Sequence, residues 1–291
     1  MAEGEEIKTK FPLKQSLKLF VFEAVLFFLT LILGVASAIR ITKVVTVKIE
    51  KISLEPFSLF DFVLSFLVAL LIVFFIIRFI KARPKAGVLF KILFVFPVFV
   101  GGFFFFSLWI GDLFALILIS LLIIYWLKKP NILIHNFLFI SGMIGVGSIF
   151  GLRLDPLLVV FLLVIFSIYD IIAVYKTKHM IKMAKAMVEA GVVPGIVLPP
   201  KAGDFQAPLK NIKVGGRFLI LGGGDIVFPL LLVTSVVLYS VTDALIITAF
   251  ATLGLLVSFL LFASQKERKP IPALPPIATF SIMGYLYTFF F

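Results

Sequence analysis

Long apolar stretches dominate this chain and leave few folds open to it. A helix needs about 20 apolar residues to cross a lipid bilayer. The chain of 291 residues is 62% hydrophobic, with a mean hydropathy of +1.21, whereas soluble domains are about 45–50% apolar. We therefore expect an all-α, polytopic integral membrane protein with nine transmembrane helices, over residues 17–39, 57–80, 87–108, 112–127, 132–151, 156–176, 218–240, 243–263 and 272–291.

The third and fourth of these spans form one apolar run from Ile92 to Leu127. As a single helix this run would be about 54 Å long, well beyond the hydrocarbon core of about 30 Å. We expect the chain to turn at Gly111-Asp112.

The basic residues gather on one side of the predicted topology. Of the 27 Lys and Arg residues, 21 lie in the N-terminal segment and the even-numbered connections, against five on the other side. Cytoplasmic loops carry such an excess, so the N-terminus is expected in the cytoplasm and the C-terminus on the opposite side. The same pattern explains the net charge of +12, and we expect no nucleic-acid partner.

Only one connection is long, and it divides the chain into an N-terminal membrane bundle (1–176), a cytoplasmic loop (177–217) and a C-terminal membrane bundle (218–291), packed as one membrane domain. The loop contains TKHMIKMAKAMVEAG, whose apolar residues recur at helical spacing. This pattern favours an interfacial helix with lysines toward anionic lipid over a site for a protein partner. The following VVPGIVLPPKAGDFQAP predicts extended or irregular chain.

Several chemistries are excluded by residue type. The chain has no cysteine and two histidines, and these histidines, His135 and His179, lie far apart without an HExxH motif. Thiol catalysis, disulfides and a zinc protease site are therefore not expected, and we predict no metal and no cofactor.

Two carboxylates are expected at one depth in the membrane. Asp170 precedes Lys176 by six residues and Asp225 follows Arg217 by eight, which places them roughly 9 and 12 Å from the cytoplasmic boundary on consecutive antiparallel helices. Each is then the other's nearest polar partner. Glu23, near the cytoplasmic end of the first span, is expected to snorkel to the surface or pair locally.

Two neighbouring carboxylates in a low-dielectric medium do not both ionise readily, so the pair shares a proton. One acid and one base around a water molecule can hydrolyse an amide. The same pair could carry protons in a coupled transporter, or it could be structural. From the residue types alone, these three alternatives stay open.

Two further features favour hydrolysis. Gly222, Gly223 and Gly224 precede Asp225 and let another backbone approach, as an unwound substrate would require. ERKPIPALPPIATF contains four prolines, and we expect no regular helix until after Pro276. An extended Pro272-Ala273-Leu274 would then face the carboxylates.

Together these residues resemble the presenilin and signal-peptide-peptidase family of intramembrane aspartyl proteases. The resemblance covers the whole chain and is closest to the archaeal-type presenilin homologues. It is carried by three motifs in order: Tyr169-Asp170, the GxGD motif within Leu221-Gly222-Gly223-Gly224-Asp225, and Pro272-Ala273-Leu274.

The resemblance implies that Asp170 and Asp225 are catalytic and cut transmembrane-helix substrates inside the bilayer. It also implies that the flanking motif residues, Pro272-Ala273-Leu274 above all, help to position the substrate and the active site. The loop between Asp170 and Asp225 is much shorter than that of a eukaryotic presenilin, so self-cleavage and assembly with accessory subunits are not expected. The oligomeric state stays open.

Overall fold

The computed structural model describes residues 13–48, 86–177, 179–212, 218–265 and 270–290, with single positions at 64, 68, 71 and 216. Apart from Leu64, Val68 and Leu71, the span expected over 57–80 lies outside the described residues. The long helices are α1 (Leu13–Lys48), α3 (Ala86–Ile110), α4 (Asp112–Lys128), α5 (Ile132–Gly151), α6 (Pro156–Ile171), α8 (Gly223–Val236), α9 (Val241–Ser264) and α10 (Leu274–Tyr287).

Five of the described helices are long and apolar enough to cross a membrane: Leu17–Val44, Gly87–Ile110, Ile132–Gly151, Pro156–Lys176 and Val241–Ser264. The helix Gly223–Val236 is apolar but shorter. This content fits a polytopic membrane protein, while the number of crossings and the side on which each terminus lies stay predictions.

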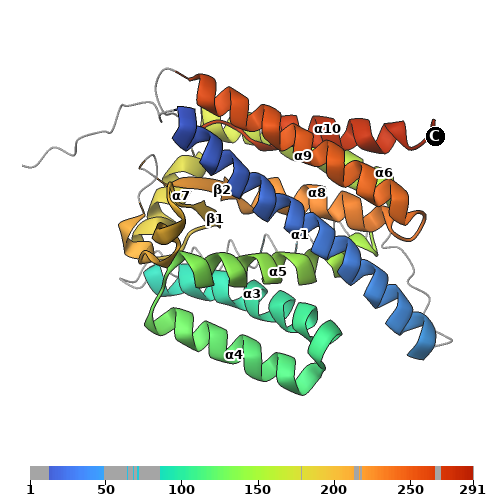
Figure 1. Cartoon of the computed structure of the whole chain (residues 1–291), viewed down its shortest axis with the longest axis horizontal. Helices are drawn as coiled ribbons and strands as arrows, with labels where there is room; N and C mark the ends of the chain where they lie inside the picture. The colour runs from blue at the N-terminus through green and yellow to red at the C-terminus, as the bar shows by residue number, and fades with distance from the viewer. Residues whose placement is uncertain are drawn as a thin grey trace, which may run out of the picture.

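The turn predicted between the third and fourth spans is confirmed. Gly111 separates α3 from α4 and has a φ of 82°, a left-handed conformation that glycine adopts without steric cost. The chain can therefore reverse within one residue, and α4 returns alongside α3 (Figure 1).

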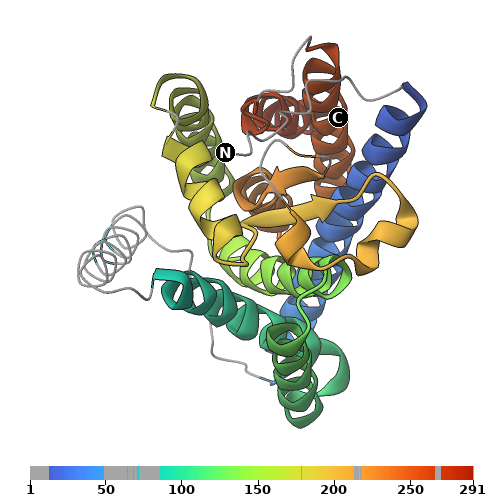
Figure 2. The same cartoon turned by 90° about the vertical axis from the view of Figure 1, so that its left-hand side faces the viewer.

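The long connection lies at one end of the helix bundle (Figure 1). It contains the amphipathic helix α7 (His179–Glu189), strand β1 (Gly195–Leu198) and two short 3₁₀ turns, η2 (Ala202–Gln206) and η3 (Leu209–Asn211). Figure 2 looks onto this end and shows the sheet in the centre, with α7 to one side.

One part of the helical prediction is wrong. Residues 219–222, expected to begin a membrane helix, form strand β2 (Leu219–Gly222), which pairs with β1 in antiparallel register, Gly195 opposite Gly222 and Leu198 opposite Leu219. The helix of this span begins only at Gly223. Buried backbone N–H and C=O groups must be paired, and β1 supplies partners for Leu219 and Leu221, since alternate residues of an antiparallel strand face its neighbour.

Small residues let the helices approach closely, as is common in membrane bundles. A Cβ on Gly142 of α5 would lie 2.9 Å from the Val98 Cα of α3, and one on Gly254 of α9 would lie 2.7 Å from the Ile277 Cα of α10. The Thr234 hydroxyl of α8 donates to the Gly147 carbonyl of α5 at 3.1 Å.

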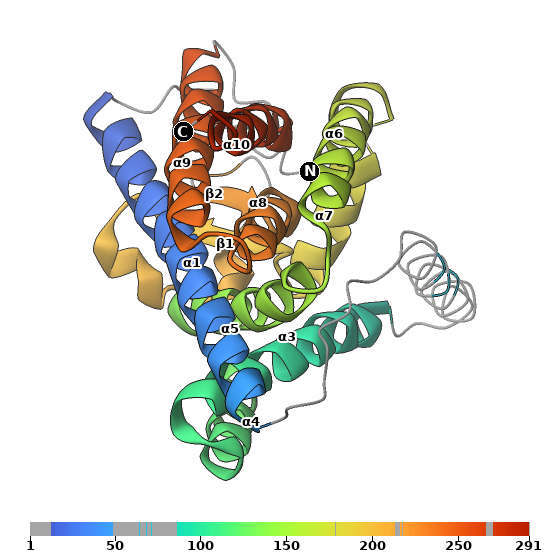
Figure 3. The ribbon, with the colours of Figure 1, turned by 90° about the vertical axis from the view of Figure 1, so that its right-hand side faces the viewer.

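The three helices that carry the predicted motifs meet. α6, α8 and α10 contact one another pairwise, while α1 contacts α5, α8 and α9. Figure 3 shows α1 and α6 on opposite sides of the molecule, with α8 and the sheet between them.

Candidate active site

Asp225 lies in the first turn of α8, three residues after the N-cap residue Gly222. Its carboxylate accepts a hydrogen bond from the backbone of Gly222. An acidic side chain at the third helical position often reaches back to the N-cap N–H in this way, and a carboxylate at this end is favoured by the helix dipole. The strand-to-helix junction thus fixes the Asp225 side chain.

Asp170 lies at the end of α6, where the helix continues as a π-helical turn, η1 (Ile172–Lys176). The backbone of Leu274 hydrogen-bonds to its carboxylate. Leu274 is the first residue of α10, so its N–H has no partner within that helix. Since Pro275 and Pro276 have no N–H, Leu274 is the one donor among the first three residues of α10.

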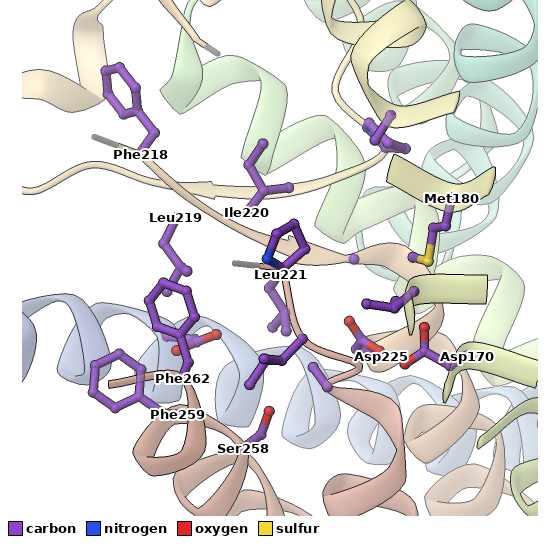
Figure 4. A pocket seen from close by; sticks show the side chains of 18 of the residues that line it. Asp170, Met180, Phe218, Leu219, Ile220, Leu221, Asp225, Ser258, Phe259 and Phe262 are labelled. Carbon is purple, nitrogen blue, oxygen red and sulfur yellow. The ribbon is translucent and has the colours of Figure 1, made fainter. Parts of the chain in front are cut away.

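The two carboxylates face the same cavity, of about 210 Å³. Asp170 is 7% exposed and Asp225 is 8% exposed, and they are close enough to interact electrostatically. Figure 4 shows them side by side next to Met180. The Asp170 Oδ2 atom is buried without a hydrogen-bond partner among the described residues.

The cavity is lined mainly by apolar side chains and backbone. None of its described lining residues is Lys, Arg or His, and within the described chain no group of three His, Cys, Asp or Glu residues could hold a metal ion. Its lining comprises Glu23, Asp170, Val174, Met180, Ala184, Pro194, Gly216, Phe218, Leu219, Ile220, Leu221, Gly222, Asp225, Ser258, Phe259, Phe262, Pro270, Ile271 and Ala273.

The outer edge of β1 is closed by two side chains of α5. Asn136 donates to the Val197 carbonyl at 2.7 Å and accepts from the Val197 N–H at 2.9 Å. The Nε2 atom of His135 donates to the Gly195 carbonyl at 3.1 Å. The Asn136 amide therefore takes the place that a neighbouring strand would have.

Among the described residues, no further strand pairs with the outer edge of β2. Because Val197 directs its backbone groups to α5, its partner Ile220 directs its own N–H and C=O away from β1. The described sheet has two strands. Residues 218–222 line the cavity, so the free edge of β2 runs along it and ends beside Asp225.

The structure brings some of the predicted site residues together and not others. Asp170, Leu221, Gly222, Asp225 and Ala273 line the cavity, and Leu274 contributes its backbone. The others do not line it: Tyr169, which is 56% exposed, and Gly223, Gly224 and Pro272.

Two local expectations need correction. The three glycines do not lie inside a helix, as the span predicted over 218–240 implies, because Gly222 is the N-cap of α8 and Gly223 and Gly224 begin its first turn. Regular helix does not wait until after Pro276, since α10 begins at Leu274 with prolines in its first turn. Proline is tolerated there because the first N–H groups of a helix have no internal partner.

Three residues of this region were not found from the sequence as parts of the site. Asn136 and Met180 carry no motif that marks them. Glu23 does carry a signal. It follows Lys18 by five residues, and Asp170 precedes Lys176 by six, so the sequence places both carboxyl groups at a similar depth in the membrane. The expectation that Glu23 snorkels to the surface is wrong, because it is 6% exposed and lines the cavity.

Comparison with known proteins finds relatives of similar fold. The fold is similar to two solved structures of a presenilin family intramembrane aspartate protease. In the C222 crystal form the TM-score is 0.63 and the identity 21%, over 92% of this chain and 97% of the other. In the P2 form these values are 0.58 and 23%, over 90% and 95%.

No curated protein matches the chain. The model of the family described as signal-peptide peptidase, presenilin aspartyl protease matches residues 18–291. Because this match spans nearly all of the chain, the protein belongs to the signal-peptide peptidase and presenilin family, and it is a multi-pass intramembrane aspartyl protease.

Proposed function

We propose that Asp170 and Asp225 are the catalytic pair, and that the protein hydrolyses peptide bonds within transmembrane helices by general acid–base activation of water. The observation that carries the proposal is that the two carboxylates, from different helices, face one cavity within electrostatic reach of each other. The outer edge of β2 lines the same cavity and ends beside Asp225. No lining residue among those described offers a compensating cation.

The reaction needs one carboxylate and one carboxylic acid. The ionised aspartate takes a proton from water as the water oxygen attacks the scissile carbonyl carbon, and the protonated aspartate donates to the carbonyl oxygen. The resulting diol collapses with transfer of a proton to the amide nitrogen, which leaves as an amine. The two carboxyl groups exchange roles over the cycle, and no acyl-enzyme forms.

The backbone contacts of the pair support this chemistry. Asp225 accepts from Gly222 and Asp170 from Leu274, so each carboxylate is oriented by main chain that is itself part of a structured junction. A group held in this way loses little entropy on reaching the geometry of the reaction. Leu274 is thus a positioning residue for Asp170.

The substrate helix must unwind before a peptide bond can be attacked. An unwound backbone inside a membrane must find hydrogen-bond partners, and a free strand edge supplies them by adding the segment as a further strand. We propose that the edge of β2, with the N–H and C=O of Ile220, receives the substrate. The extended segment then leads directly to Asp225.

The proposed topology places the site near the cytoplasmic face of the membrane. With nine crossings and a cytoplasmic N-terminus, the basic connections, α7 and the two aspartates all lie toward the cytoplasmic face. Cleavage then occurs a short distance inside this boundary, where a transmembrane substrate leaves the hydrocarbon core.

The test is cleavage of a single-span helical peptide by the purified protein in detergent. We expect cleavage within the apolar segment, blocked by a transition-state-type aspartyl protease inhibitor. Absence of cleavage over several peptides and pH values, combined with pH-driven solute uptake into reconstituted vesicles, would instead support a carrier.

A further inference from the structure

A third carboxylate lines the active-site cavity, and the proposed hydrolysis does not use it. Glu23 lies on α1, in a buried stripe that also contains Leu19, Phe27 and Leu31. Its side chain is 6% exposed, and it interacts electrostatically with Asp225. It is the one carboxyl group of the described cavity wall outside the Asp170–Asp225 pair.

One oxygen of the Glu23 carboxyl group is left unsatisfied by the described part of the chain. Its Oε2 atom is buried and has no hydrogen-bond partner among the described residues. Of the other described lining residues outside the aspartate pair, only Ser258 has a polar side chain. An isolated charge in such surroundings is strongly unfavourable unless a cation or hydrogen-bond donors reach it.

The position of Glu23 places it beside the path of an unwound substrate. Phe20, one helical turn earlier on α1, contacts the Phe259 ring with a centroid distance of 5.1 Å. Figure 4 shows Phe259 and Phe262 near Leu219, at the end of β2 away from Asp225. A segment lying along β2 would thus run from the aspartate pair toward the α1 wall that carries Glu23.

Charge complementarity indicates what would meet Glu23 there. Transmembrane helices commonly carry Lys or Arg directly after the apolar segment on the cytoplasmic side. The cavity lies near that boundary in the proposed topology, so such a residue would follow the scissile bond within a few positions. A Lys or Arg side chain can place its apolar stem against the phenylalanines and its charged end at the carboxylate.

We propose that Glu23 forms a substrate subsite that selects a Lys or Arg side chain a few residues to the cytoplasmic side of the cleaved bond. The subsite deepens the proposed function and rests on it. Glu23 contacts the substrate but not the reacting atoms, so it governs which peptides are cleaved and in which register.

The experiment uses the full-length protein in detergent and a set of single-span peptides. The peptides differ only by Lys or Leu at each of several positions after the cleaved bond. The ratio of kcat/KM for Lys over Leu is measured for the wild type and for Glu23→Gln. Thr30→Val serves as the matched control, because Thr30 is buried on the same helix, bonds the Leu26 carbonyl at 2.7 Å and does not line the cavity.

We expect wild type and Thr30→Val to favour Lys by about tenfold or more at one position, and Glu23→Gln to cut both peptides with equal kcat/KM. The subsite is overturned if the Lys peptide is not favoured at any position, or if Glu23→Gln keeps the preference. A Lys preference of equal size at every position tested would likewise overturn the subsite, because one carboxylate can reach only one position of the peptide.

Binding separates this proposal from the proposed function. Fluorescence polarisation of the same peptides on the double variant Asp170→Asn, Asp225→Asn needs no turnover. Lys-selective binding that depends on Glu23 would support the subsite even if the wild type cleaved nothing. The absence of cleavage would then overturn only the proposed hydrolysis. Cleavage without any Glu23-dependent selection would overturn only the subsite.

Discussion

The Oδ2 atom of Asp225 lies 2.9 Å from the position that a Cβ on Gly222 would occupy. The N-cap of α8 therefore has to be glycine for the Asp225 carboxylate to lie where it does. The Met180 Cε atom lies 3.8 Å from the same point, an ordinary contact, so the conflict at position 222 is with the Asp225 carboxylate.

Gly222→Ala should consequently impair catalysis more than folding. The Asp225 side chain can rotate away from the new methyl group, so the protein still folds, but the carboxylate leaves its position beside Asp170. Displacement by about 1 Å can lower a rate about 100-fold, and we expect a loss of this size in kcat for a single-span peptide.

Gly203→Ala is the matched control for this substitution, since a Cβ on Gly203 would meet nothing within 4 Å. Its kcat should equal that of the wild type. Full activity in Gly222→Ala would show that the Asp225 position seen here is not the reactive one.

Asn136 should be needed for the stability of the sheet beside the site. Asn136→Leu leaves the N–H and C=O of Val197 buried without partners, at a cost of about 2–4 kcal/mol in the free energy of unfolding. Chemical denaturation in detergent micelles measures this. Asn211→Leu, at an exposed position of η3, should change the same free energy by less than about 0.5 kcal/mol; similar curves for both variants would refute the role of Asn136.

Close packing of α9 on α10 should hold the start of α10 at the site. A Cβ on Gly254 would lie 2.7 Å from the Ile277 Cα and 2.8 Å from the Pro276 carbonyl oxygen. These are backbone atoms, so Gly254→Ala must push α10 away, at about 1–3 kcal/mol. Since Leu274 at the start of α10 contacts Asp170, we expect both the unfolding free energy and kcat to fall.

Gly87→Ala is the comparison for Gly254→Ala, because its Cβ would lie 3.7 Å from the Ala190 Cβ, an ordinary contact. It should keep both stability and kcat. If Gly254→Ala also kept both, α10 would not be held in place by this contact.

Much of this architecture follows from the sequence because helices have a fixed rise and period. Residue counting from Lys176 and Arg217 placed Asp170 and Asp225 at one depth, and the structure brings them to one cavity. Similarly, the length of the run from Ile92 to Leu127 required the turn that occurs at Gly111.

The β-sheet could not be predicted in the same way. β1 and β2 are each four residues long, and they pair across a loop, so no local period reveals them. Leu219-Ile220-Leu221 reads equally well as the start of an apolar helix. This segment is a strand because it pairs with β1, which lies far from it in the sequence and is itself bonded by Asn136 and His135 of α5.

The sequence predicts the start of α10 too late for a different reason. The four prolines predict no regular helix before Pro276, yet Pro275 and Pro276 occupy the first turn of α10, where a missing N–H has no cost. Burial of Glu23 was missed because a single acid near a helix end is more often solvated, and only the packing of α1 on α9 turns it inward.

The most direct measurement is peptide cleavage by purified Asp170→Asn and Asp225→Asn, compared with wild type and with Asp112→Asn, an exposed aspartate in the first turn of α4. Asparagine keeps the shape of the side chain but can neither accept the proton of water nor donate as an acid. We predict that both site variants lose cleavage while remaining folded, and that Asp112→Asn cleaves as the wild type does. Cleavage retained by either site variant would contradict catalysis by this pair.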